Sequence, residues 1–124
     1  VNIALIPDGG LNWLLTRTVG YRLAYQMAIE GNNISAARCL ELGLANKVVP
    51  HEELINASIE WAELISKKSS QSLRETKRVM RMAMTNDYES VFEQEAEANN
   101  ALHGSKDSLE AIQAFFEKRE PNFD

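Results

Sequence analysis

Apolar residues in this chain recur at intervals of three and four positions, which is the spacing of one helix face. Leu11, Leu14 and Leu15 make the first such stripe, and glycine or Gly-Asn punctuation separates it from those that follow. The pattern predicts helices over residues 11–19, 21–29, 36–42, 51–67, 72–84, from 86 or 87 to 103, and 108–119. The sequence therefore predicts a mainly α chain built from short helices.

Some of these predicted helices begin with recognisable capping residues. Ser35 is a good N-cap for the helix over 36–42. Ser72 with Glu75, and Asp107 with Glu110, have the spacing of a capping box, in which two side chains satisfy each other's backbone N–H groups. We therefore expect the helices over 72–84 and 108–119 to open at those boxes.

The first six residues, VNIALI, look different from the rest because they are almost entirely apolar. We expect residues 1–6 to be the end of a buried strand. A strand leaves backbone groups unpaired unless it has neighbours, and the remaining sequence contains no further strand pattern of comparable length. The segment therefore reads as the end of something longer.

Composition and charge narrow the classes of function. The length of 124 residues suits one domain, and the net charge of −5 argues against a general nucleic-acid-binding protein. Six of the thirteen basic residues fall between positions 67 and 81, a pattern typical of a solvated helix face, although such a face could also meet an anionic ligand. The single cysteine, Cys39, excludes an internal disulfide, and no apolar run is long enough for a membrane span.

Few residues have a pattern that points to chemistry. His51 and His103 lie far apart and Cys39 is alone, so we expect no metal site. Asp8 remains, in the stretch Pro-Asp-Gly-Gly. Pro followed by Asp and Gly is ordinary turn chemistry, and Asp8 could also cap the following helix. Residue types alone favour the turn, and they leave open whether Asp8 is an acid that moves protons.

Four segments match, in order, the motifs of a known family. They are LIPDGGLNWLLTRTVG at 5–20, AYQMAIEG at 24–31, ISAA followed by LGLANKVV within 34–49, and AFFEKREPNF at 114–123. These segments resemble the crotonase (enoyl-CoA hydratase/isomerase) superfamily, from the segment after its core sheet to its C-terminal signature. Because the segments span nearly the whole chain, the sequence is identified as a member of that superfamily.

The resemblance implies a fold. Crotonase-like proteins are about twice as long, and the missing N-terminal half would hold a ββα spiral core with the two backbone N–H groups of an oxyanion hole. The chain would then comprise the end of the last core strand at 1–6, a first helical segment at 7–49, and a C-terminal helical region at 50–124 that makes oligomer and CoA contacts. Family members commonly form trimers or dimers of trimers, so we expect a homotrimer or hexamer, in the cytoplasm.

The resemblance also implies an activity on acyl-CoA thioesters, in which coenzyme A is part of the substrate and no other cofactor is needed. An aspartate at the position of Asp8 is typical of the isomerase branch, where it would shuttle a proton between carbons that flank a double bond. Trp13 and Leu14 would line the acyl pocket. Phe115 and Lys118 would contact the adenine and the phosphates of CoA.

Two other functions stay open. An enoyl-CoA hydratase would use two glutamates that lie outside this chain, and Asp8 would only neighbour its site. A non-catalytic helical oligomerisation module is the third alternative, because the chain as given cannot build an oxyanion hole. Catalysis is therefore expected of a full-length parent and is open for these 124 residues alone.

Overall fold

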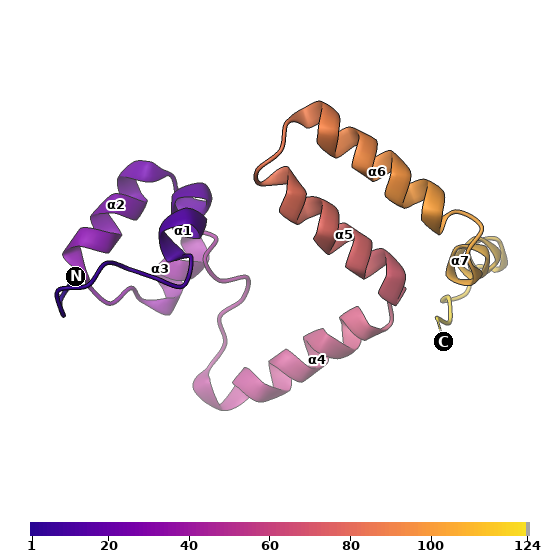
Figure 1. The fold of residues 1–124 in the computed structure, drawn as a ribbon. Helices are drawn as coiled ribbons and strands as arrows, with labels where there is room; N and C mark the ends of the chain where they lie inside the picture. Colours follow the sequence, from indigo (N-terminus) through magenta and orange to yellow (C-terminus); the bar gives the residue numbers. More distant parts are fainter. Residues whose placement is uncertain (124) are drawn as a thin grey trace. The chain divides into compact units, whose positions relative to one another are not determined.

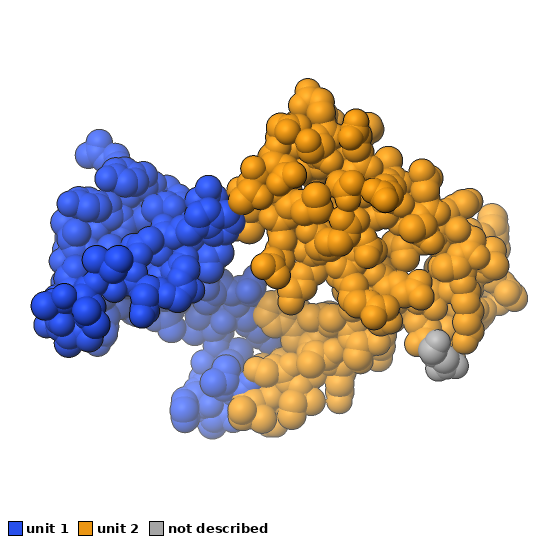
Figure 2. Space-filling model, viewed as in Figure 1, with its two compact units in different colours: residues 1–54 blue, residues 55–124 orange. Residues whose placement is uncertain are grey.

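A computed structural model describes residues 1–123, and the chain divides into two compact units, Val1–Leu54 and Ile55–Asp124 (Figure 2). The first unit contains α1 (Leu11–Val19), α2 (Tyr21–Glu30), α3 (Ala36–Glu41) and the short 3-10 helix η1 (His51–Glu53). The second contains nearly all of α4 (Leu54–Ser66), together with α5 (Ser70–Ala83), α6 (Tyr88–Leu102) and α7 (Lys106–Glu117) (Figure 1). Residues 1–123 form no strand, so the mainly α prediction is confirmed.

In the first unit, α1 packs against α2, which follows it after the single residue Gly20. Leu15 of α1 and Ala24 of α2 are the buried apolar residues of this unit. The predicted breaks at Gly20 and at Gly31 are both confirmed, because each glycine is the residue directly beyond a helix end.

In the second unit, α5 and α6 lie side by side as a helical hairpin (Figure 1). Val79 of α5 and Ala98 of α6 are buried, and Arg78 Nη1 donates a hydrogen bond to Gln94 Oε1 at 2.8 Å across the pair. In α7 the buried residue is Ala114, which is 1% exposed. The small side chain of Ala98 allows α6 to approach α5 closely.

Residues 1–6 do not form the expected strand. The backbone N–H of Ala4 donates to the carbonyl of Val1 at 2.9 Å, and Ala4 has a left-handed φ of 61°, which together make a turn. Asn2 Nδ2 donates to the carbonyl of Gly31 at 2.9 Å, which ties this turn to the end of α2. The physical reason is that a strand needs a paired neighbour for its N–H and C=O groups, and residues 1–123 supply none.

Of the predicted helix caps, one is confirmed and two are wrong. Ser35 caps α3 and Asp87 caps α6, each by accepting a hydrogen bond from the backbone N–H three residues later. The two capping boxes are wrong, because Ser69 caps α5 and Ser105 caps α7, so that both helices begin earlier than expected. In both cases the turn before the helix is shorter than expected, and the first serine after that turn becomes the N-cap.

Many large apolar side chains remain exposed while few are buried. On α4 they include Leu54, Ile55, Ile59, Trp61, Leu64 and Ile65. Contiguous apolar surface of this kind is typical of a face that packs against other protein. Within residues 1–123, no helix is both long enough and apolar enough to cross a membrane.

Candidate functional site

A tight turn connects the N-terminal segment to α1. The backbone N–H of Leu11 donates to the carbonyl of Asp8 at 3.0 Å, and the two residues between them, Gly9 and Gly10, have φ values of 62° and 87°. Positive φ at both central positions is the geometry of a type I′ turn, which glycine adopts without strain. A Cβ at either glycine would meet no atom within 4 Å, so the requirement for glycine here comes from the backbone conformation.

The side chain of Asp8 is exposed beside this turn. The N-cap of α1 is Gly10, and no side chain caps the helix, so the expectation that Asp8 could be the cap is wrong. The carboxylate makes no hydrogen bond or ion pair with residues 1–123. The turn therefore uses the backbone carbonyl of Asp8 and leaves its carboxylate unengaged.

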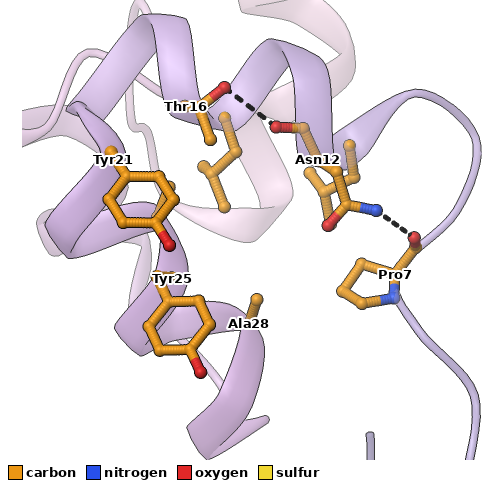
Figure 3. Close-up of a pocket in the computed structure, with 9 residues that line it drawn as sticks. Pro7, Asn12, Thr16, Tyr21, Tyr25 and Ala28 are labelled. Atoms are coloured by element: carbon orange, nitrogen blue, oxygen red, sulfur yellow. Dashed lines mark hydrogen bonds between the residues drawn. The ribbon is translucent and has the colours of Figure 1, made fainter.

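A cavity of about 190 Å³ lies between α1 and α2, next to this turn (Figure 3). It is lined by Pro7, Leu11, Asn12, Leu15, Thr16, Tyr21, Ala24, Tyr25 and Ala28. Five of the nine lining residues are aliphatic or proline, and the side chains of Asn12 and Thr16 are paired with backbone carbonyls. Asn12 Nδ2 donates to the carbonyl of Pro7, and Thr16 Oγ1 donates to the carbonyl of Asn12 at 2.9 Å.

Two tyrosines form one wall of the cavity. The rings of Tyr21 and Tyr25 are stacked, with centroids 5.9 Å apart and planes 14° from parallel. Neither tyrosine was predicted from the sequence as a site residue, although their i, i+4 spacing on a helix was a signal that could have identified them.

Trp13 and Leu14 do not line this cavity. They are 37% and 48% exposed, and they lie on a different face of α1 from the lining residues of that helix. The guanidinium of Arg17 lies 4.0 Å from the centroid of the Trp13 ring, which is a cation–π contact. Their predicted role in an acyl pocket stays a prediction.

The second unit contains the other predicted residues, at the end of α7. Phe115 and Phe116 are 79% and 77% exposed, and their rings meet edge to face with centroids 5.8 Å apart. Lys118 ends the helix with a left-handed backbone, at φ 55° and ψ 40°. Its ammonium makes no hydrogen bond or ion pair with residues 1–123. The end of α7 therefore presents to solvent an aromatic pair and a lysine that no residue in 1–123 pairs.

A cluster of ion pairs lies at the same end of α7. Arg119 pairs with Glu110 and with Glu117, and the hydrogen bond from Arg119 is the main cause that lowers the pKa of Glu110 to about 2. Glu117 also has a lowered pKa, first because Gln113 donates a hydrogen bond to it and then because of Arg119. The two acids raise the pKa of Arg119 further, so all three groups are charged at neutral pH.

The structure thus places Asp8, Trp13 and Leu14 in the first unit and Phe115 and Lys118 in the second. None of Asp8, Trp13 and Leu14 lines the cavity of the first unit, although Asp8 directly follows the lining residue Pro7. No group of three or more potential metal ligands occurs within residues 1–123.

Comparisons with known proteins give the chain its family. The family model for enoyl-CoA hydratase/isomerase matches residues 1–124. The short-chain-enoyl-CoA hydratase of Clostridium acetobutylicum is 32% identical over 119 residues, covering 96% of this chain and 46% of that protein. The 1,2-epoxyphenylacetyl-CoA isomerase of Escherichia coli is 31% identical over 121 residues, covering 98% of this chain and 46% of that protein.

The fold agrees with these similarities. The crystal structure of an enoyl-CoA hydratase from Bacillus anthracis superposes with a TM-score of 0.93 at 33% identity, covering 98% of this chain and 47% of that one. The chain therefore spans about half the length of the relatives it matches, and its helices are those of the helical part of a crotonase fold. On its matched family model, its relatives and its fold, this chain belongs to the enoyl-CoA hydratase/isomerase family of the crotonase superfamily.

Proposed function

We propose that this chain supplies the proton-transfer residue of an acyl-CoA double-bond isomerase, and that Asp8 is that residue. The observation that carries the proposal is the unengaged carboxylate at the turn, which neither caps α1 nor pairs with any residue in 1–123. A carboxylate that stabilises neither a helix nor an ion pair is free to exchange a proton with a substrate. The relative named 1,2-epoxyphenylacetyl-CoA isomerase supports an isomerase assignment.

The proposed reaction moves a double bond along the acyl chain. The carboxylate takes a proton from the carbon next to the thioester, and the electron pair moves onto the thioester oxygen as an enolate. The protonated acid then returns the proton to the far end of the double bond, while the enolate collapses to the conjugated thioester. One carboxylate can do both steps because it gains a proton in the first and loses it in the second. Hydrogen-bond donors elsewhere in the polypeptide would stabilise the enolate oxygen.

The remaining predicted contacts belong to the same proposal. Trp13 and Leu14 would line the path of the acyl chain once further protein covers their exposed side chains. Phe115 would stack on the adenine, and Lys118 would bind the phosphates of CoA, which arrives as part of the substrate. The exposed ring of Phe115, and an ammonium that no residue in 1–123 pairs, support that pair of roles.

Assembly and location are also proposed. A homotrimer or hexamer formed through residues 50–124 would cover the exposed apolar side chains of α4 and α7. The single cysteine, Cys39, is free and partly exposed, which fits an acyl-CoA enzyme in the reducing cytoplasm.

A hydratase is the second candidate function, and specific relatives favour it. Both the Clostridium acetobutylicum protein and the Bacillus anthracis structure carry the name enoyl-CoA hydratase. In a hydratase of this family, water would be added across a conjugated double bond by other acidic residues, and Asp8 would stand beside the reaction without taking part in it.

The test is Asp8→Asn in the complete polypeptide in which this chain occurs. Isomerisation of a 3-enoyl-CoA is expected to fall by about 10²- to 10⁴-fold, the usual contribution of a general acid/base. Hydration of a 2-enoyl-CoA is measured on the same samples, and circular dichroism checks the fold.

Asp87→Asn is the matched control, since asparagine is as good an N-cap as aspartate and Asp87 caps α6 in the other unit. That variant is expected to keep full activity. Isomerisation that survives in Asp8→Asn would leave Asp8 as a turn residue only. Strong hydration that is unaffected by the substitution would favour the hydratase instead.

A further inference from the structure

Arg119, the residue after Lys118, has every guanidinium nitrogen engaged inside its own corner of the chain. Nη1 and Nη2 donate to the two carboxylate oxygens of Glu110, and Nε donates to Glu117 Oε2 at 2.6 Å. Nη1 also donates to the carbonyl of Glu120 at 3.2 Å. The two adjacent cations therefore differ: each guanidinium nitrogen of Arg119 donates at least one hydrogen bond, whereas the ammonium of Lys118 is unpaired within residues 1–123.

Glu110 connects the body of α7 to the chain that follows the helix. Besides its two bonds from Arg119, it accepts a hydrogen bond from the backbone N–H of Asn122 at 2.9 Å. Bidentate pairing of a guanidinium with a carboxylate fixes direction as well as distance. We call Glu110 and Arg119, with these bonds, the clasp.

Lys118 stands between the two ends of the clasp, in a backbone conformation that a lysine rarely adopts. Its own N–H donates to the carbonyl of Phe115 at 3.3 Å, and the N–H of Arg119 donates to the carbonyl of Ala114 at 3.1 Å. This is the hydrogen-bond pattern of a Schellman-type helix end, where glycine is usual. For a residue with a Cβ the left-handed conformation costs about 1–2 kcal/mol, so it persists only where the surroundings hold it.

We propose that Glu110 and Arg119 are positioning residues that hold Lys118 in the conformation in which it binds the phosphates of CoA. This inference rests on the proposed function, and in particular on the phosphate-binding role of Lys118. The clasp assigns different tasks to the two neighbouring cations. Arg119 is occupied by three carboxylate oxygens, so it orders the corner, and Lys118 is the cation left for the ligand.

The clasp stays formed as long as both Glu110 and Arg119 are ionised. The hydrogen bond from Arg119 holds the pKa of Glu110 near 2, so the pair is ionised at every pH at which an enzyme of this kind would work. The clasp is therefore present before substrate arrives, and it lowers the entropy that ordering Lys118 would otherwise cost on binding.

The experiment compares Glu110→Gln, Lys118→Ala and the double variant in the complete polypeptide. KM and kcat are measured for an acyl-CoA and for the same acyl group on N-acetylcysteamine, a thioester that lacks the nucleotide. Glu110→Gln is expected to raise KM for the acyl-CoA about tenfold, which corresponds to about 1.4 kcal/mol, with little change in kcat. The nucleotide-free thioester should show an unchanged KM.

Two further variants sharpen the comparison. Arg119→Lys keeps the positive charge but loses the planar guanidinium that donates to both carboxylate oxygens of Glu110. It should therefore behave like Glu110→Gln. Glu41→Gln is the control, because Glu41 pairs with Arg38 at 2.7 Å within one helix of the other unit, and it should change neither KM.

The double variant is expected to be no worse than Lys118→Ala alone, since the clasp acts through that lysine. Additive losses in the double variant, or an equal rise of KM for both thioesters, would overturn the inference in favour of a general structural role. A normal KM in Glu110→Gln beside a raised one in Lys118→Ala would also overturn it, and would leave the proposed phosphate contact standing. A normal KM in Lys118→Ala would remove that contact from the proposed function and the inference with it.

Discussion

Ser69 Oγ donates a hydrogen bond to Asp107 Oδ2, joining two residues that stand 38 positions apart in the sequence. The same hydroxyl accepts from the backbone N–H of Ser72 and so caps α5, while Asp107 lies in the first turn of α7. Ser69 is a buried polar residue, at 7% exposed. A single hydroxyl thus begins one helix and holds the start of another against it.

Substitution of this serine by alanine should therefore cost more than the loss of an ordinary cap. Ser69→Ala removes a cap, worth about 1 kcal/mol, and a hydrogen bond to a charged acceptor, worth about 1.5–3 kcal/mol. Hydrogen exchange of the first-turn amides of α5 and α7 is the measurement, and both sets should exchange faster. Ser35→Ala, which removes only the exposed cap of α3, is the control and should affect that helix alone. Unchanged exchange in α7 would show that the link to Asp107 contributes nothing.

The turn that presents Asp8 should tolerate asparagine but not alanine at Gly10. Gly10 has a φ of 87° and open space around it, so Gly10→Ala meets no clash and suffers only backbone strain of about 1–2 kcal/mol. Asparagine enters the left-handed region more readily, so Gly10→Asn should recover part of the loss. Urea denaturation of the complete polypeptide gives both values. An asparagine variant as unstable as the alanine variant would contradict the conformational explanation.

Lys118 should show opposite effects on stability and on ligand affinity. Lys118→Gly removes the strain of a left-handed lysine and is expected to stabilise the protein by about 1 kcal/mol relative to Lys118→Ala. Both variants should weaken binding of an acyl-CoA, and by more at low salt than at high salt, because screening already reduces the attraction of an exposed ammonium for phosphate. Calorimetric titration at two ionic strengths measures this. Equal affinity for wild type and both variants would exclude Lys118 from the binding site.

The Glu110–Arg119 pair should make stability fall in strongly acidic solution. The pKa of Glu110 is lowered to about 2 in the folded chain from an ordinary value of 4.5. A carboxyl whose folded pKa is depressed contributes its stabilisation fully above the ordinary pKa, and the contribution is lost as pH falls through the folded value. Wild type should therefore lose stability between about pH 4.5 and pH 2, and Glu110→Gln should lose less across that window. Parallel pH profiles for the two proteins would show that the pair contributes no linkage.

Local pattern was enough to predict most of the helices. Apolar spacing identified the segments, and glycines such as Gly20 and Gly31 marked their ends, because both signals depend on neighbouring residues. The helix starts were predicted less accurately than the helices themselves. Ser72 and Asp107 both had the spacing of a capping box, yet the caps are Ser69 and Ser105, since the cap is whichever residue first follows the preceding turn.

The candidate site, like the helices, could be predicted only in part from the local sequence. A carboxylate at a Pro-Asp-Gly-Gly turn was recognisable from residue types, but those types could not separate a helix cap from a free acid. The cap was decided by Gly10, whose backbone enters α1 where a side chain from Asp8 does not reach the helix amides. The cavity wall made by Tyr21 and Tyr25 depends on α2 lying against α1, which no local pattern expresses.

The sequence by itself determined the helical segments, the glycine turn at 9–10 and the family motifs, because each of these depends on residues adjacent in the chain. Tertiary structure alone decided which carboxylates are engaged: Glu110 by Arg119, Asp107 by Ser69, and Asp8 by no residue in 1–123. It also decided that residues 1–6 form a turn rather than a strand. The reason is that a side chain's partners, and a strand's hydrogen bonds, come from segments distant in sequence, and only the folded arrangement brings those segments together or leaves them without a neighbour.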